Sequence, residues 1–440
     1  MKRHPAISML QVWTVCILAF FGLPFVLVGR TLTAWGFFAL ALFIGAFIVG
    51  ATFRTLTWPR HVQAVPAHTR IDLGMVDKIL PGVAILTVFI LAWEFAQGNF
   101  LDLSQAWEIR AERAGDLLGG QASQSSALFQ IAFILYPVGF AMLVRETLFR
   151  KDIILWRLAL FSGLPILMMS LIMGGRGPLL YAILLAFVSF RTRQRLWQGD
   201  RAVARRRVRT STLIYGSLAV VVGLAALNYF VVVFLVRAES AGGVEAMFDL
   251  VSSIWGVDFE GPVADLIIGT IGYGNTYLVF VFVWYLVQGL VMSNVIFTDF
   301  TTSPHYGIYG LELLTALMRR INGDFVADRF YPLLELNLAG FLPSAWGSLY
   351  VDWKFWGLIP AFLWGYLAAL VYHRCRERMD LRWFYLAPVV SLGIFFSLIN
   401  TPLGFGNGFV IHFWMILAFM LMRVVPAPAR QPAVALQPAE

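Results

Sequence analysis

The turn Met173-Gly-Gly-Arg-Gly-Pro178 places a single basic side chain, Arg176, between two long apolar runs. Its glycines let a ligand approach the backbone closely, because they carry no Cβ atom. A guanidinium group binds phosphate through two parallel hydrogen bonds. The turn therefore predicts a phosphate-binding role for Arg176. The alternative is an interfacial arginine that satisfies a carbonyl group of the turn.

Two further basic sites allow the same two interpretations. Arg237 ends an apolar run and stands two residues before Glu239. The two side chains form either an exposed ion pair or a second phosphate clamp with an adjacent carboxylate. Arg319 and Arg320 follow residues 309–318, an amphipathic segment expected to lie at the membrane interface. This pair binds either lipid headgroups or a phosphorylated substrate.

The segment Pro304-His-Tyr-Gly-Ile-Tyr-Gly310 contains an imidazole, His305, which suits a general base or a phosphate ligand. A structural histidine is the alternative. No second His or Cys is near it in the sequence, so a zinc site is not expected. His412 lies inside an apolar run and is expected to make a hydrogen bond between helices. Arg113 belongs to the loop 97–126, which is either a mobile sugar-contacting cap or a solvated helix face.

The composition indicates the kind of molecule that holds these groups. Of 440 residues, 59% are hydrophobic, 15% are aromatic and only 13% are charged, with a mean hydropathy of +0.76. A soluble domain carries about 25% charged residues, so a soluble enzyme, a disordered regulator and a coiled coil are excluded. Many runs of about 20 residues carry few or no charges, which is enough to span a bilayer. The two cysteines, Cys16 and Cys375, are expected to be free thiols.

We predict an all-α polytopic membrane protein with about 10–12 transmembrane helices and no soluble domain. The predicted spans are residues 7–28, 32–52, 80–95, 128–144, 153–173, 179–190, 213–236, 356–372, 384–399 and 409–422. Residues 262–297 are apolar but interrupted by glycines, and form either a hairpin of two helices or one helix plus an interfacial segment. Residues 1–425 are expected to form a single domain, and the tail 426–440 a disordered cytoplasmic extension.

Short cytoplasmic loops carry an excess of Lys and Arg, which orients the chain. With both termini inside, 24 of the 33 basic residues and only 8 of the 25 acidic residues are cytoplasmic. The loop 191–210 holds the largest basic cluster, expected to rest on anionic lipid headgroups at about 1 kcal/mol per charge. The net charge of +8 therefore needs no nucleic acid partner.

This orientation places the loops 97–126, 237–262 and 298–345 on the outer side. Nine basic residues lie on the outer side as a whole, where Lys and Arg are disfavoured, so each is a candidate for function. They are Arg30, Arg110, Arg113, Arg176, Arg237, Arg319, Arg320, Arg329 and Lys354.

Several segments, in this order, resemble Wzy-type O-antigen and oligosaccharide repeat-unit polymerases. Gly174-Gly-Arg-Gly177 is similar to their Ser/Gly-Arg-Gly turn. Trp284-Tyr-Leu-Val-Gln-Gly-Leu290, the Pro304–Gly310 segment and Arg319-Arg320 are similar to their Tyr-Leu-x-x-Gly, Pro-x-x-Gly and basic succession. Leu349-Tyr-Val-Asp-Trp-Lys-Phe-Trp-Gly-Leu-Ile359 resembles their late Tyr-x-Asp-Phe-Gly-x-x-Gly element, with Trp-Lys-Phe-Trp between the Asp and the Gly. The similarity covers roughly residues 164–372.

The resemblance implies a glycosyltransferase of GT-C-like architecture in the bacterial inner membrane. Such enzymes transfer a growing glycan from polyprenyl pyrophosphate to a new lipid-linked repeat unit at the periplasmic face. The implied partners are these lipid-linked oligosaccharides, membrane lipids and a chain-length-regulating co-polymerase. The family uses neither a metal nor another cofactor.

In that chemistry, negative charge gathers on the departing pyrophosphate, and fixed guanidinium groups stabilise it. Arg176 and Arg237 are the first candidates for the clamp, followed by Arg319 and Arg320. The base that removes the proton of the acceptor hydroxyl is expected to be Glu239 or His305, with Asp352 third. Stacking on sugars is expected of Tyr306, Tyr309 and Tyr350, with Arg113 as a further substrate contact. An interfacial aromatic belt is the alternative for the tyrosines.

Three other functions stay open. An O-antigen ligase would share the pyrophosphate clamp and use a catalytic His in an outer loop, which the His305 segment partly matches. A lipid-linked oligosaccharide flippase would show internal repeats and charges at mid-membrane, and neither is apparent in the sequence. A structural scaffold would not need outward basic residues beside glycine turns.

Overall fold

A computed structural model describes residues 3–58, 69–97, 127–150, 152–173, 177–196, 242–336, 342–377, 380–404 and 407–426, and six positions between 228 and 239. This part of the chain is helical apart from four short strands, and it contains seven helical segments long and apolar enough to cross a membrane. The prediction of an all-α multi-pass membrane protein is confirmed.

The long segments follow the predicted runs. They are α1 (Pro5–Gly22), α2 (Ala34–Leu56), α3 (Gly74–Gln97), α5 with α6 (Ala127–Leu135, Val138–Phe149), α7 to α8 (Leu155–Leu158, η1 Ala159–Gly163, Leu164–Ile172), α13 (Tyr273–Asp299) and α16 to α17 (Ser344–Trp353, η3 Lys354–Gly357, Leu358–Arg376). Shorter or more basic helices are α9 (Gly177–Leu196), η4 (Leu381–Tyr385), α18 (Ala387–Phe396) and α19 (Gly408–Leu421). The first run ends earlier than predicted because Pro24 cannot continue the helix. The predicted span 213–236 lies almost wholly outside the described residues.

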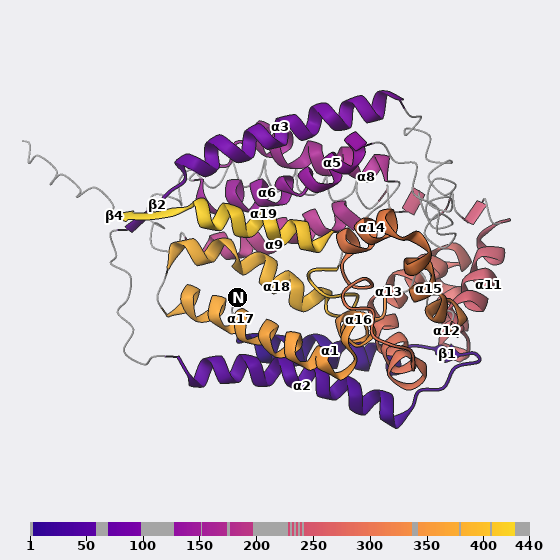
Figure 1. Ribbon diagram of the computed structural model, residues 1–440. Coiled ribbons are helices and arrows are strands. Elements are labelled where there is room, and N and C mark those ends of the chain that lie inside the picture. The colour runs from indigo at the N-terminus through magenta and orange to yellow at the C-terminus, as the bar shows by residue number, and fades with distance from the viewer. Residues whose placement is uncertain are drawn as a thin grey trace, which may run out of the picture.

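Two small sheets mark opposite ends of the helix bundle (Figure 1). Strand β1 (Phe25–Leu27) pairs antiparallel with β3 (Val257–Phe259), and β2 (Thr69–Asp72) pairs antiparallel with β4 (Arg423–Pro426). Each pair joins two segments that the sequence assigns to the same side of the membrane, so the pairing agrees with the predicted order of crossings. We refer to the β1–β3 end and the β2–β4 end.

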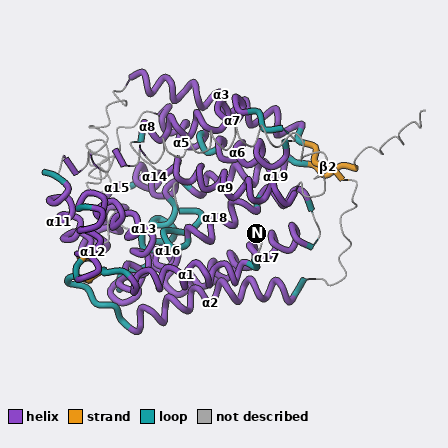
Figure 2. Tube along the Cα trace, turned by 180° about the vertical axis from the view of Figure 1, so that it is seen from behind, coloured by secondary structure: helices purple, strands orange, loops and turns teal. Residues whose placement is uncertain are grey.

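Helices α2 and α17 form the most extensive helix pair, and small residues allow their close approach. A Cβ atom at Gly50 would overlap the carbonyl oxygen of Phe362, and one at Gly365 would overlap that of Phe47. Glycine lets the two backbones touch, as in membrane helix pairs generally. The two helices run in the same direction, and the view from behind shows them adjacent as well (Figure 2).

Residues 262–297 form one long helix, α13, preceded by a short one, and not a hairpin of two long helices. Helix α13 packs on the link between α1 and α2 at the β1–β3 end. Its Trp284 ring packs 5.6 Å from Phe25, and its Asn294 accepts a hydrogen bond of 2.9 Å from the Thr33 backbone N–H. Phe25 and Thr33 both belong to the link between α1 and α2, so both halves of α13 meet that link. The short α12 (Pro262–Ile271) precedes it, and α11 (Val244–Trp255) packs on its first half.

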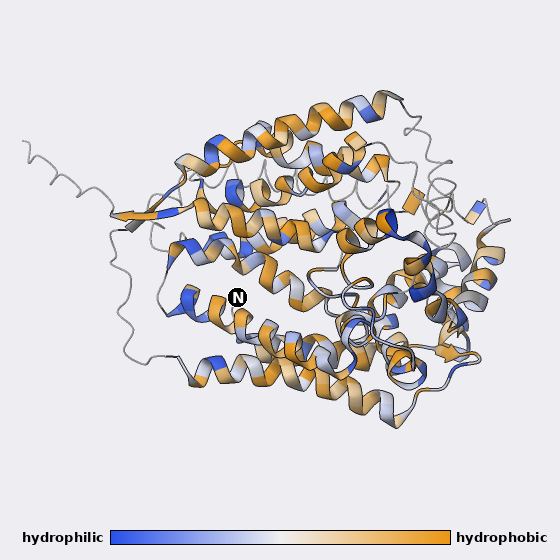
Figure 3. Cartoon of the chain, in the orientation of Figure 1, coloured by the Kyte–Doolittle hydropathy of each residue, from blue (hydrophilic) through white to orange (hydrophobic). Residues whose placement is uncertain are grey.

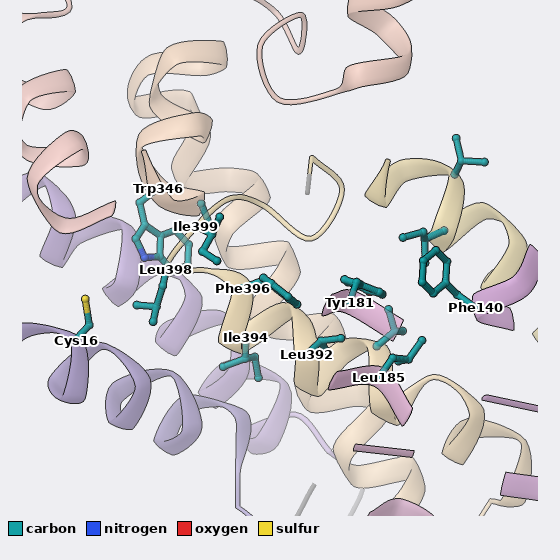
Figure 4. Close-up of a cluster of buried hydrophobic side chains, with 14 of the residues drawn as sticks. Cys16, Phe140, Tyr181, Leu185, Trp346, Leu392, Ile394, Phe396, Leu398 and Ile399 are labelled. Atoms are coloured by element: carbon teal, nitrogen blue, oxygen red, sulfur yellow. The ribbon is translucent and has the colours of Figure 1, made fainter. Parts of the chain in front are cut away.

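Helix α16 begins deep inside the bundle. Its Trp346 packs 6.3 Å from Phe47, which lies 13 residues, or about 20 Å, into α2. The backbone N–H of Ala345 donates to the Ser397 carbonyl (2.8 Å), at the tip of the α18–α19 hairpin. Figure 4 shows Trp346 beside Leu398 at this meeting point. A half-helix and a helical hairpin therefore meet near mid-depth, and α16 runs from there toward the β1–β3 end.

The surface hydropathy agrees with a membrane environment. The long helices are mostly apolar along their length, while hydrophilic residues gather at the β2–β4 end and on α14 (Glu312–Ile321) and α15 (Gly323–Glu335) (Figure 3). Large side chains such as Phe89 and Leu86 are more than half exposed and would face lipid. Cys16 and Cys375 are free, as predicted.

Candidate functional site

Asp352, in the last turn of α16, organises the predicted His305 segment. Its side chain is 3% exposed, and its two carboxylate oxygens accept hydrogen bonds from the backbone N–H groups of Tyr309 (3.0 Å) and Gly310 (2.8 Å). The Tyr306 N–H donates to the Asp352 carbonyl (2.9 Å), and the His305 N–H to the Val351 carbonyl (3.1 Å). The carboxylate thus fixes the 304–310 loop against α16.

Strained backbone gathers around this contact. Among the described non-glycine residues, four adopt a positive φ: Tyr306 (54°), Ser344 (63°), Lys354 (50°) and Asn407 (63°). They lie in the 304–310 loop, at the two ends of α16 and at the start of α19. Each such conformation costs on the order of 1–3 kcal/mol and is retained where the surroundings enforce it, most often at functional sites.

His305 is enclosed and electrically neutral. It is 1% exposed, and its ring lies between Phe300 (5.3 Å) and Phe330 (6.2 Å). Burial, and then the charges of Arg329 and Lys354, lower the pKa of His305 to about 4. At neutral pH the imidazole therefore carries no charge.

The two cations beside His305 are held by neutral groups. Lys354 Nζ donates to the Phe300 carbonyl (2.6 Å) and lies 3.9 Å from the centre of the Phe300 ring. Arg329 donates to Ser303 Oγ (2.5 Å) and to the Pro304 carbonyl (3.1 Å). Because these partners carry no negative charge, the positive potential of both side chains persists at the site.

An apolar groove of about 680 Å³ extends from the Asp352 contact along α17. One wall runs from Trp356 of η3 to Ala368 of α17, and the facing wall is formed by Val390 of α18, Leu403 between α18 and α19, and His412 of α19. Gly307, Gly310 and Asp352 close its β1–β3 end. The groove therefore joins a polar site to a long apolar surface.

Polar groups also border the tip of the α18–α19 hairpin. Ser348 Oγ donates to Asn400 Oδ1 (2.9 Å), and the Thr401 N–H donates to the same oxygen (2.7 Å). Thr401 lines the groove. The polar pair Asn400-Thr401 between two apolar runs is the only sequence signal for this part of the site, and polar residues in a turn between spans are too common to single it out.

The structure brings together only some of the predicted residues. The 304–310 loop and α16 bring together five of them: His305, Tyr306, Tyr309, Tyr350 and Asp352. Tyr306 is exposed, whereas Tyr350 is buried between Phe43 and Phe355. Arg319 and Arg320 lie in the last turn of α14, whose Thr315 bonds to the Ile308 carbonyl of the loop.

Of the other predicted site residues, the structure describes Glu239 alone. Glu239 is exposed and follows a different part of the chain, ahead of α11. Arg113, Arg176 and Arg237 lie outside the described residues. Among the described residues, no group of three His, Cys, Asp or Glu side chains is arranged to hold a metal ion.

No protein-family model matches the chain, and neither a curated protein nor a solved structure is significantly similar to it. The functional argument therefore depends on this geometry and on the resemblance of the motifs.

Proposed function

We propose that the protein is a membrane glycosyltransferase that polymerises oligosaccharide repeat units carried on polyprenyl pyrophosphate, with a GT-C-like architecture. The observation that carries the proposal is the groove, which begins at Asp352 and the 304–310 loop and continues as an apolar wall. An amphiphile with one charged head and one long hydrocarbon chain matches this arrangement. A polyprenyl pyrophosphate is such a molecule.

The dimensions of the groove support a chain rather than a compact ligand. The wall from Trp356 to Ala368 covers 12 helical steps, about 18 Å, which is more than half of a hydrocarbon core of about 30 Å. Each buried methylene contributes about 0.8 kcal/mol, so several isoprene units held there would anchor the substrate. The reacting head would then remain at the β1–β3 end.

Charge supports the same chemistry. Breaking the anomeric C–O bond leaves negative charge on the pyrophosphate, and fixed cations in a site of low dielectric lower that barrier. We assign this role to Arg176 and Arg237, followed by Arg319 and Arg320, and add Lys354 and Arg329, which donate to neutral partners. The periplasmic face of the bacterial inner membrane is the proposed location, and a chain-length-regulating co-polymerase the proposed partner.

The test fills the groove without touching the polar site. Leu363→Trp places a larger side chain on the groove wall, and Leu86→Trp makes the same change on α3, outside the groove; the two leucines are 50% and 52% exposed. In a polymerase-null host, wild type and Leu86→Trp are expected to restore a ladder of long glycans. Leu363→Trp is expected to shorten the ladder to one or a few repeats at equal membrane level.

Other outcomes identify other functions. If single repeat units fail to reach their acceptor when the protein is absent, it is a ligase or a flippase. If Leu363→Trp supports the same ladder as Leu86→Trp, the groove does not hold the carrier and the proposal loses its main support.

A further inference from the structure

His412 is an ionisable side chain on the wall of the groove. It lies four residues after Gly408, in the first turns of α19, and it lines the same groove as Asp352 and Thr401. Its Nδ1 is 2.8 Å from the Gly408 carbonyl oxygen of its own helix. The predicted hydrogen bond between helices is therefore replaced by one within α19.

This bond determines which nitrogen carries the proton. A carbonyl oxygen only accepts, so Nδ1 must be the donor, and in the neutral ring Nε2 then has a lone pair. No described residue hydrogen bonds to Nε2. A hydrocarbon chain has no hydrogen to donate to this lone pair, whereas a hydroxyl group of a ligand in the groove has one. Nε2 is therefore an acceptor that the hydroxyl group of such a ligand can use.

The other candidate bases are less suited to a ligand in the groove. The oxygens of Asp352 already accept from Tyr309 and Gly310. His305 is enclosed by Phe300 and Phe330, and Glu239 belongs to a segment ahead of α11. Neither of the last two lines the groove.

We propose that His412 Nε2 accepts the hydrogen bond, and during reaction the proton, of a sugar hydroxyl that enters the groove. This inference rests on the proposed function. The hydroxyl oxygen forms the new bond to the anomeric carbon, and the bond from that carbon to the pyrophosphate breaks with its electron pair staying on the pyrophosphate. The hydroxyl proton moves to Nε2, while Nδ1–H remains on the Gly408 carbonyl.

The first experiment separates proton transfer from positioning. Wild type, His412→Ala and His412→Gln are compared in vesicles supplied with a lipid-linked repeat unit, with His4→Gln as a control at the β2–β4 end. General base catalysis contributes 10²- to 10⁴-fold, so both His412 variants are expected to lose at least about 100-fold in kcat. Added imidazole should restore part of the activity of His412→Ala but not of His412→Gln, whose side chain still occupies the space. His4→Gln should retain the wild-type rate.

The second experiment does not depend on turnover. Binding of a polyprenol and of its methyl ether is compared by native mass spectrometry for wild type and His412→Phe. Wild type is expected to prefer the alcohol by about fivefold, since one hydrogen bond is worth about 1 kcal/mol, and His412→Phe should bind both equally. Equal binding by wild type, or a wild-type rate in His412→Gln, overturns the role of His412. If wild type binds the alcohol selectively but polymerises no repeat units, His412 Nε2 is a hydrogen-bond acceptor for the ligand and the proposed reaction is refuted.

Discussion

The two ends of the bundle satisfy their charged side chains in opposite ways. At the β2–β4 end, Glu146 is fully buried and pairs with Arg145 (2.5 Å), Arg150 (2.6 Å) and Arg157 (3.4 Å), and Asp77 pairs with Arg145. At the β1–β3 end, Asp352 accepts from backbone N–H groups, and Lys354 and Arg329 donate to carbonyls.

The difference distinguishes charges that are neutralised within the structure from charges that can still act on a ligand. A charge paired with an opposite charge has its field largely cancelled, whereas one held by neutral dipoles retains it. The His4–Thr55–His373–Glu377 chain of hydrogen bonds, with links of 2.8, 3.0 and 2.7 Å, joins α1, α2 and α17 in the same self-contained manner at the β2–β4 end. We therefore expect substitutions at that end to affect stability, and those at the other end to affect ligand handling as well.

The largest effect is expected from Glu146→Ala. It leaves Arg145 buried with part of its pairing lost, and breaking a buried ion pair costs about 3–5 kcal/mol. The measurement is the thermal unfolding midpoint in detergent together with the membrane level of the protein, and both should fall sharply.

The matched control removes the buried pair at the centre of the network, Arg145 and Glu146. Replacing Arg145 by Met and Glu146 by Leu in one variant should recover much of the loss, because apolar residues of similar volume often substitute for a buried pair at little cost. If the double variant is as unstable as Glu146→Ala, the β2–β4 end needs its charges for more than mutual pairing, and the contrast between the ends weakens.

A smaller effect is expected from Asp352→Ala. The change leaves the N–H groups of Tyr309 and Gly310 without their acceptor, at about 1–3 kcal/mol for each buried donor. Amide hydrogen exchange should accelerate in the 304–310 loop while α2 and α17 stay protected. Asp352→Asn keeps one acceptor oxygen and should lose about half as much. Equal exchange in all three proteins would show that the carboxylate does not hold the loop.

The sequence predicted the membrane-spanning elements well and the site only in part. Apolar runs and basic loops depend on local composition, so α2, α17 and α19 were found close to their bounds. The depth of α16 was not predicted, because the expected span began only at residue 356 and the outer loop was expected to reach residue 345. Only the contacts of Trp346 place the first turn of α16 at mid-bundle. For His412 the sequence predicted only a hydrogen bond between helices, because the groove that it lines is formed with α17, a distant part of the chain.

The smallest predicted effect is the pH dependence with which the 304–310 loop opens, and it depends on His305. The pKa of His305 is about 4 in the folded loop and near 6.5 in an opened one, so the opened loop binds the proton first as the pH falls. Stability from this group is complete above about pH 6.5 and is lost progressively toward pH 4. Between pH 7.5 and 5.5 we expect a loss of about 1 kcal/mol in the free energy of loop opening, measured by amide exchange. His305→Gln, which cannot be protonated, should remove this dependence, whereas His4→Gln should leave it intact. A loop that opens equally at both pH values in wild type would mean that burial does not keep His305 neutral, and the contrast with the β2–β4 end would then depend on Lys354, Arg329 and Asp352 alone.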